Sequence, residues 1–130
     1  FSYASDTRGT SPFLPVHKGY CFQTLQLPTT LPTLDEILDR HSQVNDILLA
    51  SLKEPFNVHT IHAEVEGRSY LSLFEDLLKK LSDLGVEFFR LRDMADLIYE
   101  RGLEKIPKLA LTQGKIPGRS GWVAYQGSPA

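Results

Sequence analysis

Apolar residues recur at the spacing of an α-helix over residues 69–84 and form one continuous stripe. Gly85 follows the stripe and predicts the end of the helix, because glycine readily adopts the left-handed conformation that terminates many helices. Thr33 and Glu36 form a capping box, which predicts the start of another helix. Shorter apolar patterns predict further helices over 33–39, 45–53 and 93–101. The residues of the stripe are Leu71, Phe74, Leu77, Leu78, Leu81 and Leu84.

Segments rich in β-branched and aromatic residues predict strands over 1–5, 21–27, 56–62 and 86–89. After Leu103, glycine and proline recur, so regular structure is expected to fade. We therefore expect one domain over residues 1–102 and a Gly/Pro-rich C-terminal tail over 103–130. The alternation of strands and helices predicts an α/β fold with parallel strands and crossover helices. Such folds carry their chemistry at the carboxyl ends of the strands.

The composition narrows the functional classes. The chain has 130 residues, which fits one domain, with 42% hydrophobic and 23% charged residues. A net charge of −2 argues against a nucleic-acid partner. The single cysteine, Cys21, excludes an internal disulfide framework and a Cys-rich zinc site. No apolar run approaches the roughly 18 residues that a membrane span needs.

The chain begins at Phe1 within a strand pattern, without a preceding cap, turn or polar leader. We expect it to be the C-terminal portion of a longer protein. The alternative is a chain trimmed at a proteolytic site, with nothing functional lost.

Two candidate site residues lie where predicted strands end. Asp6 follows the first strand, with Arg8 two residues on, and His62 ends the strand over 56–62. A carboxylate beside an imidazole fixes its tautomer and favours its protonated form, which suits a general acid. The functional interpretation is an acid–base His62 oriented by Asp6. The alternative, which these residues alone favour, is a solvated aspartate and a strand-end histidine bonded to a carbonyl.

Other residues carry weaker signals. His62, Glu64 and Glu66 are two apart and would share a face of a continued strand, a spacing compatible with a metal ion. A solvated acidic loop explains them equally well. In the tail, Arg119 suits a phosphate and Trp122 suits a ring or an acyl chain. The alternative is a packed C-terminal strap with Arg119 in water.

Four segments together resemble the C-terminal part of the polysaccharide deacetylase (NodB-homology) superfamily, and within it the 4-deoxy-4-formamido-L-arabinose-phosphoundecaprenol deformylases. The resemblance covers nearly the whole chain. The second and third segments are specific to the deformylases. The segments are Tyr3-Ala4-Ser5-Asp6-Thr7-Arg8-Gly9, Leu27-Pro28-Thr29-Thr30-Leu31-Pro32-Thr33-Leu34-Asp35-Glu36, Thr60-Ile61-His62-Ala63-Glu64-Val65-Glu66-Gly67 and Gly118-Arg119-Ser120-Gly121-Trp122.

The resemblance implies that residues 1–102 are the C-terminal portion of an irregular (β/α) barrel. It implies a metal-dependent hydrolase that removes an N-formyl or N-acetyl group from an amino sugar. His62 matches the family's general acid and Asp6 the carboxylate that orients it. The substrate contacts expected from the resemblance and the local chemistry are Glu64, Glu66, Arg8, Arg119 and Trp122.

The same resemblance implies an undecaprenyl-phosphate-linked sugar of lipopolysaccharide and lipid A modification as substrate. The enzyme would act in the bacterial cytoplasm or on the cytoplasmic face of the inner membrane, with peripheral membrane contact. The family's base, its metal ligands and its arginine motif have no counterpart here. We therefore expect zinc or a similar divalent ion in the full-length protein, none bound by this chain alone, and no turnover by it. The competing hypothesis is a non-catalytic carbohydrate- or lipid-carrier-binding module, or an inactive fragment, on the same scaffold.

Overall fold

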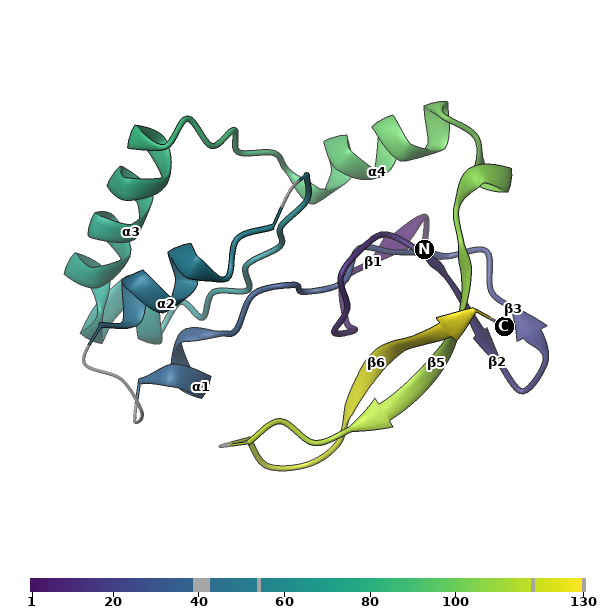
Figure 1. The fold of residues 1–130 in the computed structure, drawn as a ribbon, viewed down its shortest axis with the longest axis horizontal. Helices are drawn as coiled ribbons and strands as arrows, with labels where there is room; N and C mark the ends of the chain where they lie inside the picture. Colours follow the sequence, from purple (N-terminus) through teal and green to yellow (C-terminus); the bar gives the residue numbers. More distant parts are fainter. Residues whose placement is uncertain (39–42, 54, 118, 130) are drawn as a thin grey trace. The chain divides into compact units, whose positions relative to one another are not determined.

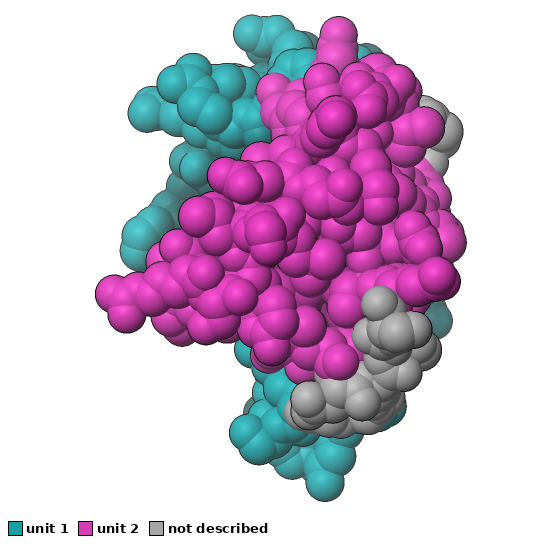
Figure 2. Space-filling model, turned by 90° about the vertical axis from the view of Figure 1, so that its left-hand side faces the viewer, with its two compact units in different colours: residues 1–30, 89–130 teal, residues 31–88 magenta. Residues whose placement is uncertain are grey.

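The computed structural model describes residues 1–38, 43–53, 55–117 and 119–129. The chain divides into two compact units (Figure 2). Unit 1 comprises residues 1–30 and 89–130, and unit 2 comprises residues 31–88. Each unit is described by itself below.

Unit 1 holds the strands (Figure 1). A parallel pair joins β1 (Tyr3–Ala4) to β4 (Leu25–Gln26). A second sheet has the order β3-β2-β5-β6, in which β2 and β5 are parallel and the outer pairs are antiparallel. Its strands are β2 (Leu14–His17), β3 (Tyr20–Cys21), β5 (Lys108–Gly114) and β6 (Val123–Pro129). The unit also contains α4 (Leu91–Glu100) and the 3₁₀-helix Leu103–Lys105.

Most of the core of unit 1 comes from its first segment, and its second segment adds the buried residues Ala95 and Ile106. Phe13, Leu14, Leu25 and Leu27 are almost completely buried, and each such side chain contributes about 1.5–3 kcal/mol of transfer free energy. Gln126 on β6 ties this segment to the end of the chain, because its Nε2 donates to the Ser11 carbonyl at 2.8 Å. Residues at opposite ends of the sequence therefore share one structural unit.

Unit 2 is helical in the part of the chain that the structure describes (Figure 1). Its core consists of apolar residues from α1, α2 and α3. Its helices are α1 (Leu34–Ile37), α2 (Val44–Ala50), a π-helix over Val65–Ser69 and α3 (Leu71–Asp83). The buried residues are Leu34, Ile37, Val44, Leu48 and Leu77.

A polar clamp joins α2 to α3. The Asn45 side-chain amide donates to the Leu73 carbonyl at 2.9 Å and to Asp76 Oδ2 at 2.8 Å. Lys80 Nζ lies 2.9 Å from the same Asp76 oxygen. The hydrogen bonds from Lys80 and Asn45 hold the pKa of the Asp76 carboxyl below its ordinary value. Asn45 is buried, so its amide is satisfied within the protein rather than by solvent.

The predicted helices are confirmed with shifted ends. The Thr33 N–H donates to Glu36 Oε2 at 3.1 Å, as the capping box predicts. Gly85 follows α3 with a φ of 73°. Residue 39, the expected end of the first helix, lies outside the described residues. The expected helix over 69–84 instead begins with the π-helical turn, and α3 starts at Leu71.

The strand predictions over 56–62 and 86–89 were wrong, as was the expected loss of regular structure after residue 103. Residues 56–62 and 86–89 form no strand, although the Val58 carbonyl accepts a hydrogen bond from the Leu31 N–H at 3.2 Å. A strand requires a ladder of such bonds. Conversely, β5 and β6 pair as the long hairpin seen in Figure 1. The four-stranded sheet is mixed, because it contains both parallel and antiparallel pairs, rather than parallel throughout. The structure contains helices and strands and is consistent with the predicted α/β class. That the chain forms part of a barrel stays a prediction.

No helix within the described residues is both long enough and apolar enough to cross a bilayer.

Candidate functional site

His62 lies where an extended segment turns into the π-helix of unit 2. Its carbonyl accepts hydrogen bonds from the N–H groups of Val65 at 2.9 Å and Glu66 at 3.0 Å. Its own N–H donates to Glu66 Oε2 at 2.8 Å. Both backbone polar groups of His62 are therefore held by the turn that follows, while its side chain stays about one-third exposed.

Asp35 is the carboxylate that unit 2 places beside the His62 imidazole. Its Oδ1 lies 3.8 Å from His62 Nδ1, and the two side chains are 49% and 36% exposed. This distance is too long for a hydrogen bond but short enough for an electrostatic interaction. Asp35 sits in the first turn of α1, which the Thr33–Glu36 capping box fixes.

Asp35 was not among the site residues predicted from the sequence, although it belongs to the Leu-Pro-Thr-Leu-Asp-Glu segment that supported the resemblance. The capping box around it was the one local signal that its position is fixed. Its proximity to His62 depends on the packing of α1 against the π-helical turn, which lies 30 to 34 residues after Asp35 in the sequence.

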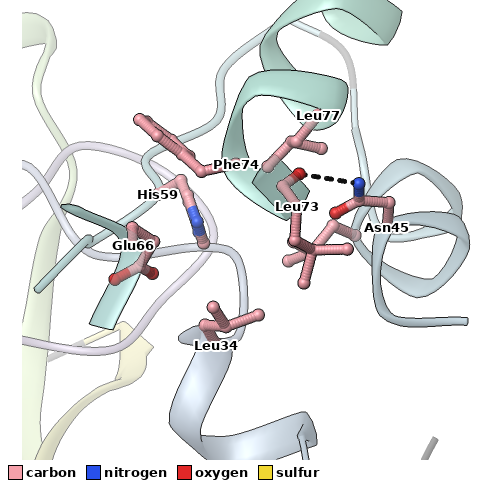
Figure 3. Close-up of a pocket in the computed structure, with 8 residues that line it drawn as sticks. Leu34, Asn45, His59, Glu66, Leu73, Phe74 and Leu77 are labelled. Atoms are coloured by element: carbon pink, nitrogen blue, oxygen red, sulfur yellow. Dashed lines mark hydrogen bonds between the residues drawn. The ribbon is translucent and has the colours of Figure 1, made fainter. Parts of the chain in front are cut away.

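Glu64 and Glu66 differ in their surroundings. Glu64 is exposed, whereas Glu66 is only 2% exposed. Glu66 lines a small pocket together with His59, Leu34, Phe74 and other apolar residues (Figure 3). Among the described residues, Glu66 Oε1 has no hydrogen-bond partner. The strand face that would have aligned both glutamates with His62 does not exist, because a turn and a π-helix occupy this segment.

The remaining predicted site residues belong to unit 1. Asp6 is exposed after β1, and the backbone of Arg8 bridges to Thr29 and Tyr125. Since Asp6 and His62 belong to different units, their pairing stays a prediction. The side chains drawn in Figure 3 all belong to unit 2.

Arg119 and Trp122 lie in the loop that joins β5 to β6. Both are exposed, Trp122 by 68%, and Lys115 Nζ lies 5.3 Å from the centre of the Trp122 ring. The Arg119 N–H donates to the Ile116 carbonyl at 3.0 Å, which closes the turn. Gly118, part of the segment quoted for the resemblance, lies outside the described residues. This loop presents cations and an indole ring together.

Within the described ranges, no three His, Cys, Asp or Glu side chains gather closely enough to hold a metal ion.

No family model matches the chain. It is 38% identical over 131 residues to "Probable 4-deoxy-4-formamido-L-arabinose-phosphoundecaprenol deformylase ArnD" of Wigglesworthia glossinidia brevipalpis. It is 36% identical over 133 residues to the protein of the same name from Shewanella sediminis. These matches cover 97% and 98% of the chain but only 44% and 41% of the relatives. The chain thus spans less than half the length of the curated relatives that it matches.

Proposed function

We propose that the chain is part of a carbohydrate N-deformylase, a hydrolase that acts on a lipid-linked formamido-arabinose, and that His62 is its general acid. The proposal is supported by the names of the two relatives, each of which matches nearly the whole chain. The structural observation that carries it is the fixed, partly exposed His62 with a carboxylate beside its Nδ1.

Hydrolysis of a formamide requires a proton at the departing nitrogen. Water adds to the formyl carbon, the carbon–nitrogen bond breaks, and formate and the free sugar amine are released. His62 would donate its Nε2 proton to that nitrogen, because an amine anion is too poor a leaving group to depart unprotonated. Asp35 would favour a proton on Nδ1 and so direct Nε2 toward the substrate. Asp6 remains a proposed second orienting carboxylate.

The remaining assignments concern the substrate and the metal. Glu64, exposed two residues after His62, would bind sugar hydroxyls, and Arg8 would assist. Arg119 would bind the phosphate that links sugar to lipid, and Trp122 would contact the first part of the lipid. The same proposal gives the full-length protein a divalent ion and a peripheral place at the cytoplasmic face of a bacterial membrane. The substrate itself, rather than a spanning helix, would provide the membrane contact.

His62→Ala in the full-length protein tests the proposal. Formate release from the lipid-linked formamido-sugar should fall by about 10²–10⁴-fold, the usual contribution of a general acid. His17→Ala is the matched control, because His17 is exposed at the end of β2 in unit 1, and its rate should not change. An unchanged rate in His62→Ala would remove His62 from the mechanism. Saturable binding of the sugar without any formate release would favour the non-catalytic binding module instead.

A further inference from the structure

Glu66 is a buried carboxylate with one specific task visible in the structure. It is 2% exposed, and its Oε2 accepts the hydrogen bond from the His62 N–H at 2.8 Å. In return, the Glu66 N–H donates to the His62 carbonyl at 3.0 Å. A glutamate is rarely buried to this degree unless a partner compensates its lost hydration. Here the partner is the backbone of the proposed general acid.

The π-helical turn explains why Glu66 faces inward. The turn runs over Val65–Ser69, and the Tyr70 N–H closes it on the Val65 carbonyl at 3.0 Å. Within it Glu66 is buried, while the residues on either side in sequence are more exposed. Single π-helical turns are uncommon and are frequent at functional sites, where they redirect one side chain.

The pocket around Glu66 holds its side chain in place. Leu34, Phe74 and Leu77 line this pocket beside Glu66 and His59 (Figure 3). Five of the eight residues that line the pocket are apolar, and Glu66 is 2% exposed, so a bulky sugar would find little of its carboxylate to contact. Glu66 is therefore better suited to hold the His62 backbone than to touch the substrate.

We propose that Glu66 is a positioning residue that sets the direction of the His62 imidazole through the His62 N–H. This inference rests on the proposed function, because it assigns Glu66 a role only through the general acid. The Cα–Cβ bond of His62 follows the orientation of its peptide plane, so losing the Oε2 hydrogen bond would let the imidazole drift. A misplacement of about 1 Å in a catalytic group can cost about 10²-fold in rate.

Three variants of the full-length protein distinguish whether Glu66 acts as a hydrogen-bond acceptor or through its charge. Glu66→Gln keeps a carbonyl oxygen at the same reach, so kcat should stay within about twofold of the original. Glu66→Asp keeps the charge but withdraws the oxygen by one methylene, so kcat should fall by about ten- to a hundredfold. KM should change little in both. Glu75→Asp is the matched control, because Glu75 is exposed on α3 of the same unit, and its kcat should not follow the loss in Glu66→Asp. Thermal unfolding of each variant establishes that the protein is folded.

A double-variant cycle tests whether Glu66 acts through His62. In a His62→Ala background, Glu66→Asp should cause no further loss, because the group that it positions is gone. Additive losses would overturn the inference, and so would a Glu66→Gln variant that loses more kcat than Glu66→Asp. If His62→Ala itself leaves the rate unchanged, the proposed function fails. If His62→Ala is slow but Glu66→Asp is normal, only the positioning role fails.

Discussion

Asp35 Oδ1 lies 3.8 Å from His62 Nδ1, and both residues belong to the same unit of the structure. Asp35 is fixed on α1 by the capping box, and His62 is fixed by the turn that Glu66 closes. In the proposed mechanism, Asp35 would orient the imidazole through its side chain and Glu66 through its backbone. We therefore expect Asp35 and Glu66 to affect the rate of the reaction to different extents.

Asp35→Asn should lower kcat of the full-length protein by no more than about fivefold. The side chains of His62 and Asp35 are 36% and 49% exposed, and ion pairs exposed to this degree contribute about 0.2–1 kcal/mol. A tenfold change in rate needs about 1.4 kcal/mol. Steady-state formate release measures the effect, and Asp83→Asn, exposed at the end of α3, is the control. A loss as large as that of His62→Ala would show that Asp35 contacts the reacting atoms.

Arg119→Ala should raise KM for the phosphate-linked sugar and leave kcat nearly unchanged, since a phosphate contact far from the reacting carbon binds ground and transition states equally. We expect a rise of about tenfold, typical of losing one charge-assisted hydrogen bond. A soluble formamido-sugar without phosphate is the control substrate, and its KM should not respond. Equal changes for both substrates would contradict a role for Arg119 in phosphate binding.

Leu77→Ala should destabilise the protein by about 2–5 kcal/mol, because Leu77 is 4% exposed at the centre of the unit 2 core. Leu78→Ala should cost about 1 kcal/mol or less, because more than a third of that side chain is already in water. Urea denaturation of the full-length variants measures the difference. Similar losses at the two neighbouring positions would place the core on a different face of α3.

The stability conferred by Asp76 should depend on pH in one direction. Hydrogen bonds from Lys80 and Asn45 lower the pKa of the Asp76 carboxyl in the folded state. The stabilisation that results is therefore fully present above the pKa of an unfolded aspartate, about 3.9. That contribution is lost as the pH falls through the lowered folded-state value. The difference in the free energy of unfolding between the original protein and Asp76→Asn should therefore be present at pH 6 and shrink at pH 2–3. Urea denaturation at both pH values measures it, and a difference that grows in acid would contradict the clamp.

Local patterns predicted the helices well, because helical spacing and the Thr33–Glu36 box depend on residues within one or two turns. Residues 56–62 have strand-like composition, yet composition does not supply the neighbouring strand that a ladder needs. In contrast, β5 and β6 were not predicted, because the glycine and proline residues after Leu103 were taken to end regular structure. Gly121 instead adopts a φ of 86° in the loop that joins these two paired strands.

The candidate site shows the same division. His62 was selected from its place at the end of the strand predicted over 56–62, which the structure does not contain, although the turn that follows holds the His62 backbone. Asp35 was missed because its approach to His62 depends on packing between distant segments. Glu66 was interpreted either as part of a continued strand face or as part of a solvated acidic loop, whereas the π-helical turn buries it. The period of a π-helix cannot be recognised in a segment of five residues.

The parallel pairing of β2 with β5 joins Leu14 to Lys108 and Val16 to Ala110, and unit 2 lies between these positions in the sequence. During synthesis the ribosome must deliver β5 before this sheet can close, whereas residues 31–88 emerge as one continuous stretch. We expect the helical segment to acquire its native contacts first, because contacts between distant residues form slowly. Until then β2 lacks the partner strand that β5 provides.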